Sequence, residues 1–225
     1  MYNSITPENA LIVYPISGDT SGSLSVGLNS AAGLRGKICS PRQAMYNGTL
    51  RNITTLRAAN TTQGIDANGF AGNENITHIF FEGSLNGTST IQAIDNFALR
   101  DMVNLEYIDF PDSLTTIRQG ACIRDYKLSF SDTNKINRFG QQCFNGVNMI
   151  GTYPVLQIAG NINDIGQGAF LQAGWKAISI GSSSDPCELS INNLGNGGNR
   201  TFGGYNYSYT GTQAYTLDSF TLYST

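Results

Sequence analysis

The stretch Ile91-Gln-Ala-Ile94-Asp-Asn-Phe-Ala98-Leu99 decides the fold of this chain, because it is the first of four copies of one phrase. The other copies are Leu114-Thr-Thr-Ile117-Arg-Gln-Gly-Ala121-Cys122, Ile136-Asn-Arg-Phe139-Gly-Gln-Gln-Cys143-Phe144 and Ile162-Asn-Asp-Ile165-Gly-Gln-Gly-Ala169-Phe170. Their fourth residues lie 23, 22 and 26 residues apart. Such a period is typical of a solenoid, in which each repeat is one element stacked on the next.

A second phrase follows each of these copies and carries apolar residues at i, i+3 and i+5. It is complete in Leu105-Glu-Tyr-Ile108-Asp-Phe110-Pro111 and Trp175-Lys-Ala-Ile178-Ser-Ile180, and its second half recurs in Leu128-Ser-Phe130 and Leu156-Gln-Ile158. Alternation of apolar and polar residues that ends at proline or glycine indicates a short strand with one buried face. Each coil is therefore predicted to contain a strand.

The run from Asn104 to Ile117, together with Ile165-Gly-Gln-Gly-Ala169-Phe170, resembles the BspA-type leucine-rich repeat. That repeat joins a small-residue-Leu-x-x-Ile-x-Ile-Pro strand to a Val-x-x-Ile-Gly-x-x-Ala-Phe turn. The resemblance implies a solenoid with a parallel sheet and a non-catalytic binding role, commonly at a cell or virion surface. We expect a leucine-rich-repeat solenoid of about six coils, with short parallel strands on one face and turns and short helices on the other.

We expect the chain to divide into two parts, residues 1–48 and residues 49–225. Weaker copies of the phrases, at Leu50, Ile65, Asn75 and Leu217, extend the predicted solenoid over residues 49–225. Residues 1–48 do not fit the repeat. Since the first coil of a solenoid exposes its core and needs a cover, they form either an N-terminal cap or a segment that docks onto another protein.

Composition narrows the classes of partner. Only 13% of the residues are charged and the formal net charge is −3, so the basic face that nucleic acid requires is not expected. The longest apolar run, residues 10–16, is far shorter than the roughly 20 residues that span a bilayer. The first ten residues do not resemble a secretory signal. We therefore expect no nucleic-acid partner, no membrane insertion and no visible export route.

The inventory of reactive residues argues against catalysis. With one histidine, His78, neither a Ser-His-Asp triad nor a multi-histidine metal site can form. The acidic residues are scattered, and the four cysteines have no metal-ligand spacing. Cys122 and Cys143 replace apolar residues of the phrase in neighbouring coils, where they are predicted to be buried, and a disulfide between them is left open. We expect no enzyme, cofactor or metal.

The outward face of the strands is the predicted binding surface. Because successive side chains of a strand alternate faces, the residues between the buried ones point outward. They form one file of His78, Tyr107, Lys127 and Gln157, and a second of Phe80, Asp109, Ser129 and Ser179. Exposed aromatic residues are typical contact anchors, although a neighbouring segment could instead cover Phe80. The run of Tyr205, Tyr207 and Tyr209 is a second candidate contact loop, or packs back on the solenoid.

These features predict a structural or binding protein. A solenoid with a polar, weakly charged surface and a non-repeat N-terminus suits a bacteriophage virion component: a capsid decoration, a head fibre or a tail-associated protein. Its expected partners are other virion or surface proteins, a host-surface glycan or protein, and other copies of itself. A bacterial or protist cell-surface adhesin and an intracellular interaction scaffold are the alternatives.

Overall fold

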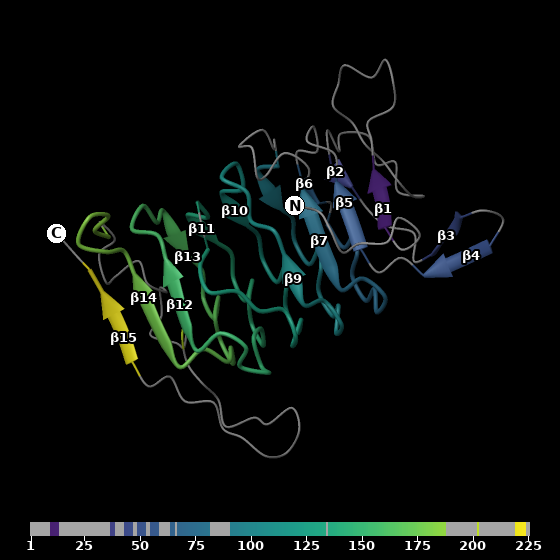
Figure 1. Ribbon diagram of the computed structural model, residues 1–225. Coiled ribbons are helices and arrows are strands. Elements are labelled where there is room, and N and C mark those ends of the chain that lie inside the picture. Colours follow the sequence, from purple (N-terminus) through teal and green to yellow (C-terminus); the bar gives the residue numbers. More distant parts are fainter. Residues whose placement is uncertain are drawn as a thin grey trace.

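The computed structural model describes residues 64–65, 67–81, 91–133, 135–187, 202 and 219–223, and the backbone of residues 10–13, 37–38, 43–46, 49–52 and 55–58. These residues form a parallel β-solenoid, in which the chain passes alternately through two rows of strands (Figure 1). Four turns lie between Ile65 and Ile165. Strands β2 (Lys37–Ile38) and β15 (Ser219–Leu222) lie beyond these turns at either end.

One row is a continuous six-stranded parallel sheet, here called the rear sheet. Its order is β13-β11-β10-β8-β6-β2. The strands are β2 (Lys37–Ile38), β6 (Gly64–Ile65), β8 (Ala93–Ile94), β10 (Thr116–Ile117), β11 (Arg138–Phe139) and β13 (Asp164–Ile165). The fourth residue of each copy of the first phrase ends one of these strands, and successive copies pair in register.

The other row, the front face, consists of two parallel sheets. The first has the order β1-β5-β7-β9 and the second β12-β14-β15. The strands are β1 (Ala10–Val13), β5 (Thr55–Ala58), β7 (His78–Phe81), β9 (Tyr107–Ile108), β12 (Val155–Ile158), β14 (Ala177–Ile180) and β15 (Ser219–Leu222). A separate antiparallel hairpin joins β3 (Gln43–Tyr46) to β4 (Thr49–Asn52).

The segment 1–48 contributes a strand to each row. β1 pairs in parallel with β5, and β2 with β6, so both extend the solenoid in the direction of the N-terminus. The hairpin β3–β4 spans the predicted boundary between residues 48 and 49. Whether this segment caps the solenoid or attaches the chain to another protein stays a prediction.

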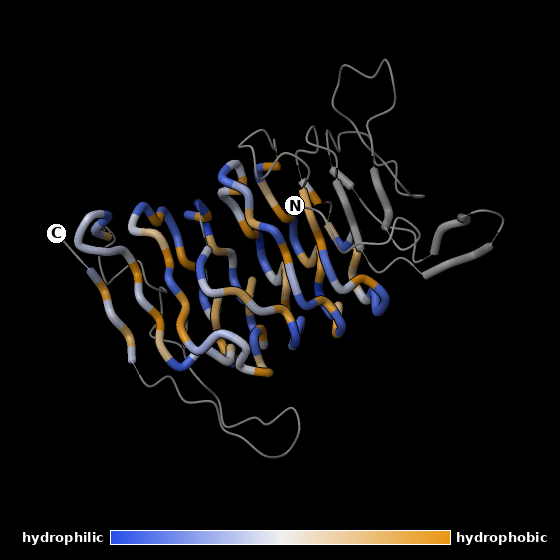
Figure 2. Tube along the Cα trace, viewed as in Figure 1, coloured by the Kyte–Doolittle hydropathy of each residue, from blue (hydrophilic) through white to orange (hydrophobic). Residues whose placement is uncertain are grey.

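The core lies between the two rows. The rear-sheet anchors Ile65, Ile94, Ile117, Phe139 and Ile165 are at most 1% exposed. Hydrophobic and hydrophilic residues alternate along each coil in Figure 2, which is the pattern that one buried face produces. As predicted, Cys122 and Cys143 are fully buried, and both carry free thiols.

The prediction of short helices opposite the strands is wrong, since the described residues contain no helix. The turn after each rear strand has a positive φ at the third and the seventh residue beyond the anchor: Asn68 and Gly72, Phe97 and Asp101, Gly120 and Arg124, Gln142 and Gly146, Gly168 and Gln172. A left-handed residue every fourth position interrupts a right-handed helix. The turn N–H groups bond the next coil instead, as in Leu99 N to Ala121 O and Cys122 N to Cys143 O, both 2.8 Å.

The front face is interrupted between β9 and β12. The phrase there has Asp125 where other coils have Ile76, Leu105 or Trp175. The Leu128 carbonyl accepts its bond from Asn148 N at 2.8 Å, and the Tyr126 carbonyl from Met149 N at 2.9 Å. Because a loop of the next coil uses these carbonyls, residues 128–130 do not form a strand. This interruption shapes the candidate site.

Candidate functional site

Three aromatic side chains form a cluster on the outward side of β7 and β9. Ile79 and Phe81 point into the core and are at most 1% exposed, so His78 and Phe80, which alternate with them, face outward. His78 pairs with Tyr107 in the β7–β9 register. The Phe80 and Tyr107 ring centroids are 5.5 Å apart, and each lies 6.1 Å from that of His78. The three rings thus form one aromatic platform, defined here as His78, Phe80 and Tyr107.

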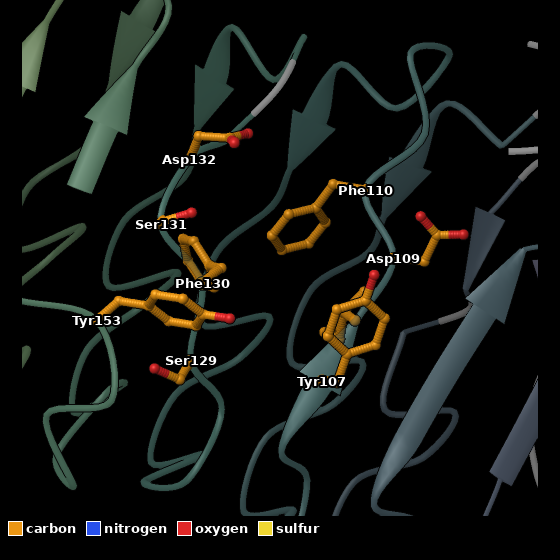
Figure 3. Close-up of a pocket in the computed structure, with 9 residues that line it drawn as sticks. Tyr107, Asp109, Phe110, Ser129, Phe130, Ser131, Asp132 and Tyr153 are labelled. Atoms are coloured by element: carbon orange, nitrogen blue, oxygen red, sulfur yellow. The ribbon is translucent and has the colours of Figure 1, made fainter. Parts of the chain in front are cut away.

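The interruption of the front face beside this platform holds a pocket of about 390 Å³. It is lined by Tyr107, Ile108, Asp109, Phe110, Ser129, Phe130, Ser131, Asp132 and Tyr153. In Figure 3, Tyr107 and Tyr153 stand on opposite sides of the pocket, Phe110 lies between them, and the Tyr153 hydroxyl points toward the side of Tyr107. Tyr107 is 39% exposed and Tyr153 40%, so both rings are open to a ligand.

The lining of the pocket is acidic. Its described residues include Asp109 and Asp132, and none of them is a lysine, arginine or histidine. Burial raises the pKa of Tyr107 above its ordinary value, and the neighbouring Asp109 and Tyr153 raise it further. The Tyr107 phenol therefore stays protonated at neutral pH and can donate a hydrogen bond.

One wall of the pocket depends on Asn148, which is fully buried. Its Nδ2 donates to the Tyr153 carbonyl at 2.8 Å, and its Oδ1 accepts a hydrogen bond from the Ser129 hydroxyl. A 3.4 Å bond from Tyr153 N to the same Oδ1 completes the link. Asn148 thus fixes the loop that carries Tyr153 against the coil that carries Ser129.

The prediction that Ser129 is exposed is wrong. Ser129 is 6% exposed, because its hydroxyl bonds Asn148 and its backbone N donates to Glu106 O at 3.3 Å. The loop from the next coil covers the position that strand alternation predicts to be open. Although Ser129 lines the pocket, its hydroxyl is bonded to Asn148 in the pocket wall.

The other predicted site residues divide between the pocket and its surroundings. Tyr107 and Asp109 line the pocket, and His78 and Phe80 adjoin it through the platform. Three residues lie outside its lining: Lys127, whose Nζ donates to Asn104 Oδ1 at 2.8 Å; Gln157, whose Nε2 donates to Gly181 O at 2.8 Å; and Ser179, the β14 register partner of Gln157. Tyr205, Tyr207 and Tyr209 lie outside the described residues.

Six further lining residues did not enter the predicted site: Ile108, Phe110, Phe130, Ser131, Asp132 and Tyr153. Phe110 occupies a position that the phrase assigns to the core, yet it is only partly buried. Tyr153 lies in the extra length of the coil between Phe139 and Ile165, which has 26 residues against 22 and 23 in the two preceding coils. The additional length of this coil was the signal in the sequence for an extra segment that carries Tyr153.

A buried acid, Asp125, lies in the same coil as Ser129 and outside the pocket lining. Asp125 is fully buried; its Oδ1 accepts a 2.8 Å bond from Met102 N, while its Oδ2 has no hydrogen-bond partner among the described residues. Burial raises the pKa of this carboxyl well above its usual range, and the bond from Met102 only partly opposes that shift. Asp125 is therefore expected to be neutral in the folded chain.

No group of three or more His, Cys, Asp or Glu side chains in the part of the chain that the structure describes could hold a metal ion. No helix long and apolar enough to cross a bilayer occurs among those same residues. The thiols of Cys122 and Cys143 have pKa values raised by burial, so they are poor nucleophiles and poor metal ligands at neutral pH.

The fold and the outward platform define a class: a leucine-rich-repeat solenoid, an architecture that offers extended surfaces for binding. The sequence of the chain gives the family. The BspA type leucine rich repeat region matches residues 41–151 and 83–190, with six copies of the repeat, and the chain belongs to this family. No curated protein matches the chain.

Three solved structures are similar to the chain. The pneumococcal vaccine antigen PcpA is 21% identical, with a TM-score of 0.47 over 67% of this chain and 40% of PcpA. A leucine-rich repeat protein from Bacteroides ovatus is 19% identical, with a TM-score of 0.42 over 64% of this chain and 39% of the other. A leucine rich cell surface protein from Faecalibacterium prausnitzii is 12% identical, with a TM-score of 0.23 over 69% and 68%. The chain thus spans about two fifths of the first two proteins.

Proposed function

We propose that the protein is a non-enzymatic binding protein that acts at the outer surface of a bacteriophage virion, as a capsid decoration, a head fibre or a tail-associated component. It contacts a protein or glycan through the front face of the solenoid. The observation that carries the binding role is the aromatic platform of His78, Phe80 and Tyr107, which continues into the acidic pocket.

The binding role has an energetic basis. Interface energy concentrates in a few aromatic residues that sit in partly formed pockets, and about 2 kcal/mol or more is lost when such a residue is truncated. Tyr107 belongs to both the platform and the pocket and is 39% exposed. Rigid strands hold the rings, so little conformational entropy is lost on contact.

The virion setting is supported by composition. With 13% of residues charged and a net charge of −3, the surface is hydrated mainly by uncharged polar groups. Adhesins share such a composition, so a bacterial or protist cell-surface adhesin is the second candidate, and an intracellular scaffold is the third. The three candidates differ in where the protein is found.

Localisation tests this proposal. Antibodies against the protein are used to probe density-purified phage particles, envelope fractions and cytosol from the same culture. The proposal predicts a fixed ratio of the protein to the major capsid protein across the particle peak, and immunogold label on the particles. Protein confined to the cell envelope would establish the adhesin instead, and protein confined to the cytosol would leave only the scaffold.

A further inference from the structure

We propose that the pocket between Tyr107 and Tyr153 binds one sugar ring of an oligosaccharide that carries no acidic groups, and that it prefers an amine-bearing sugar to its neutral counterpart. This inference rests on the proposed function, since it names the ligand class of the same front face.

The shape of the pocket suits a sugar ring. Its volume of about 390 Å³ lies in the range of small-molecule sites. Tyr107 and Tyr153 flank it and Phe110 lies between them, so flat aromatic surfaces face the cavity (Figure 3). A pyranose has an apolar C–H face that packs on such rings and a rim of hydroxyl groups that need partners. Ser131 and Asp132 at the pocket supply polar atoms for that rim.

The platform extends the site beyond one ring. Phe80 lies 5.5 Å from Tyr107, and His78 stacks on Phe80 at 6.1 Å with an interplanar angle of 11°. Strands of one sheet are about 4.8 Å apart, so aromatic residues on adjacent strands recur at roughly the spacing of linked sugar rings. A chain of sugars that has one ring in the pocket can therefore place a neighbouring ring over Phe80.

Charge selects among oligosaccharides. Asp109 and Asp132 line a concave site whose described residues include no lysine, arginine or histidine. Such a site concentrates negative potential, which attracts cations and repels carboxylates and sulfates. The faces of Tyr107 and Tyr153 add a favourable interaction with a nearby ammonium group. An amine-bearing sugar is thus expected to bind best and an acidic sugar worst.

The backbone argues against an extended peptide as the ligand. A peptide that added a strand at the interruption would need backbone groups of residues 128–132. The Leu128 carbonyl already accepts from Asn148 N, and the Ser129 N–H already donates to Glu106 O. Asp132 is bridged in parallel to Gln157. The interruption therefore offers side chains to a ligand and few backbone partners.

Isothermal titration calorimetry of the full chain tests the inference with three tetrasaccharides of equal length: β-1,4-linked glucosamine, β-1,4-linked N-acetylglucosamine and α-1,4-linked galacturonic acid. The expected order of affinity is the order given, and the glucosamine tetramer is expected to weaken most as salt is raised. Tyr107→Ala and Tyr153→Ala are each expected to weaken binding at least about tenfold. Tyr223→Ala removes a tyrosine of similar exposure, 43%, beyond β15 and is expected to change nothing.

Asp132→Asn tests the contribution of the negative charge of Asp132 to the preference for an amine-bearing sugar. Asp132 is exposed, so the substitution leaves the core intact, and it is expected to reduce the preference for glucosamine over N-acetylglucosamine while binding of the neutral tetramer is retained. A preference that is undiminished in Asp132→Asn, or tightest binding of galacturonic acid, would overturn the charge assignment. Equal weakening by Tyr107→Ala and Tyr223→Ala would overturn the location.

Two further outcomes separate this inference from the proposed function. If none of the tetramers binds but a lysine-rich peptide does, and Tyr107→Ala abolishes that binding, the saccharide assignment is overturned while the binding role of the front face stands. If a tetramer is recovered in shorter pieces, the non-enzymatic assignment is overturned, because Asp109 and Asp132 would then act as a carboxylate pair.

Discussion

Replacement of Asp125 by leucine is expected to stabilise the protein at neutral pH. Asp125 is fully buried at a position where the neighbouring coils have Leu105 and Ile76, and its Oδ2 has no hydrogen-bond partner among the described residues. An unsatisfied buried polar atom costs about 1–3 kcal/mol, and a buried leucine contributes about 1.5–3 kcal/mol. Loss of the bond from Met102 N offsets about 1 kcal/mol of that gain.

These contributions sum to an expected gain of about 1.5–5 kcal/mol in the free energy of unfolding for Asp125→Leu. For a chain of this size, 1 kcal/mol corresponds to about 2–4 °C, so the melting temperature at pH 7 should rise by about 3–20 °C. Urea unfolding followed by far-UV circular dichroism gives the free energy directly. Asp125→Asn is the control for shape, since it keeps the acceptor for Met102 N and cannot titrate.

The pH dependence tests the same reasoning with a definite sign. Burial raises the pKa of Asp125 in the folded chain, whereas the unfolded chain has the ordinary value of about 3.9. The folded state therefore holds a proton that the unfolded state releases, and stability falls as pH rises from about 4 toward the raised value. Between pH 4 and 8 the wild type should lose more stability than Asp125→Asn. Equal slopes, or a leucine variant less stable than the wild type at pH 7, would refute the argument.

Two further predictions concern the pocket wall and the thiols. Asn148→Ala should lower the free energy of unfolding by about 2 kcal/mol or more, because the Ser129 hydroxyl and the Tyr153 carbonyl lose a buried partner. Gln157→Ala, which removes the bond that an exposed side chain donates to Gly181 O, should cost less than about 1 kcal/mol in the same urea titration; equal losses would show that Asn148 does not fix the wall. In a Cys39→Ser variant, Ellman's reagent should detect no thiol until the protein is unfolded, because the remaining cysteines are at most 1% exposed: Cys122, Cys143 and Cys187. Rapid labelling of the native variant would contradict their burial.

The sequence predicts the coil well because one physical requirement repeats in every turn. An apolar residue must fill the same place in each coil, so the anchors from Ile94 to Ile165 reveal the period. The parallel strands follow from the same rule, including β15 at the C-terminal end. Outward positions follow from alternation wherever a strand forms, which is why His78, Phe80 and Tyr107 were found.

The prediction is weaker where several coils act together. The turns repeat a left-handed residue at fixed positions, but Phe97, Arg124 and Gln142 occupy them as well as glycine, so composition does not reveal them. The burial of Ser129 depends on Asn148 from the next coil.

The pocket results from a missing strand, and its two signals in the sequence are indirect. One is Asp125 at an apolar position, and the other is the longer coil that carries Tyr153. Neither gives the position of the tyrosine ring, which is determined by contacts between coils.

The measurement that tests the central claim most directly is a structure of the full chain with the glucosamine tetramer bound. The account predicts one sugar ring between Tyr107 and Tyr153, with its amine toward Asp109 or Asp132 and a neighbouring ring over Phe80. An ordered sugar elsewhere on the chain, with the Tyr107–Tyr153 pocket empty, would contradict the claim that this interruption of the front face is the binding site.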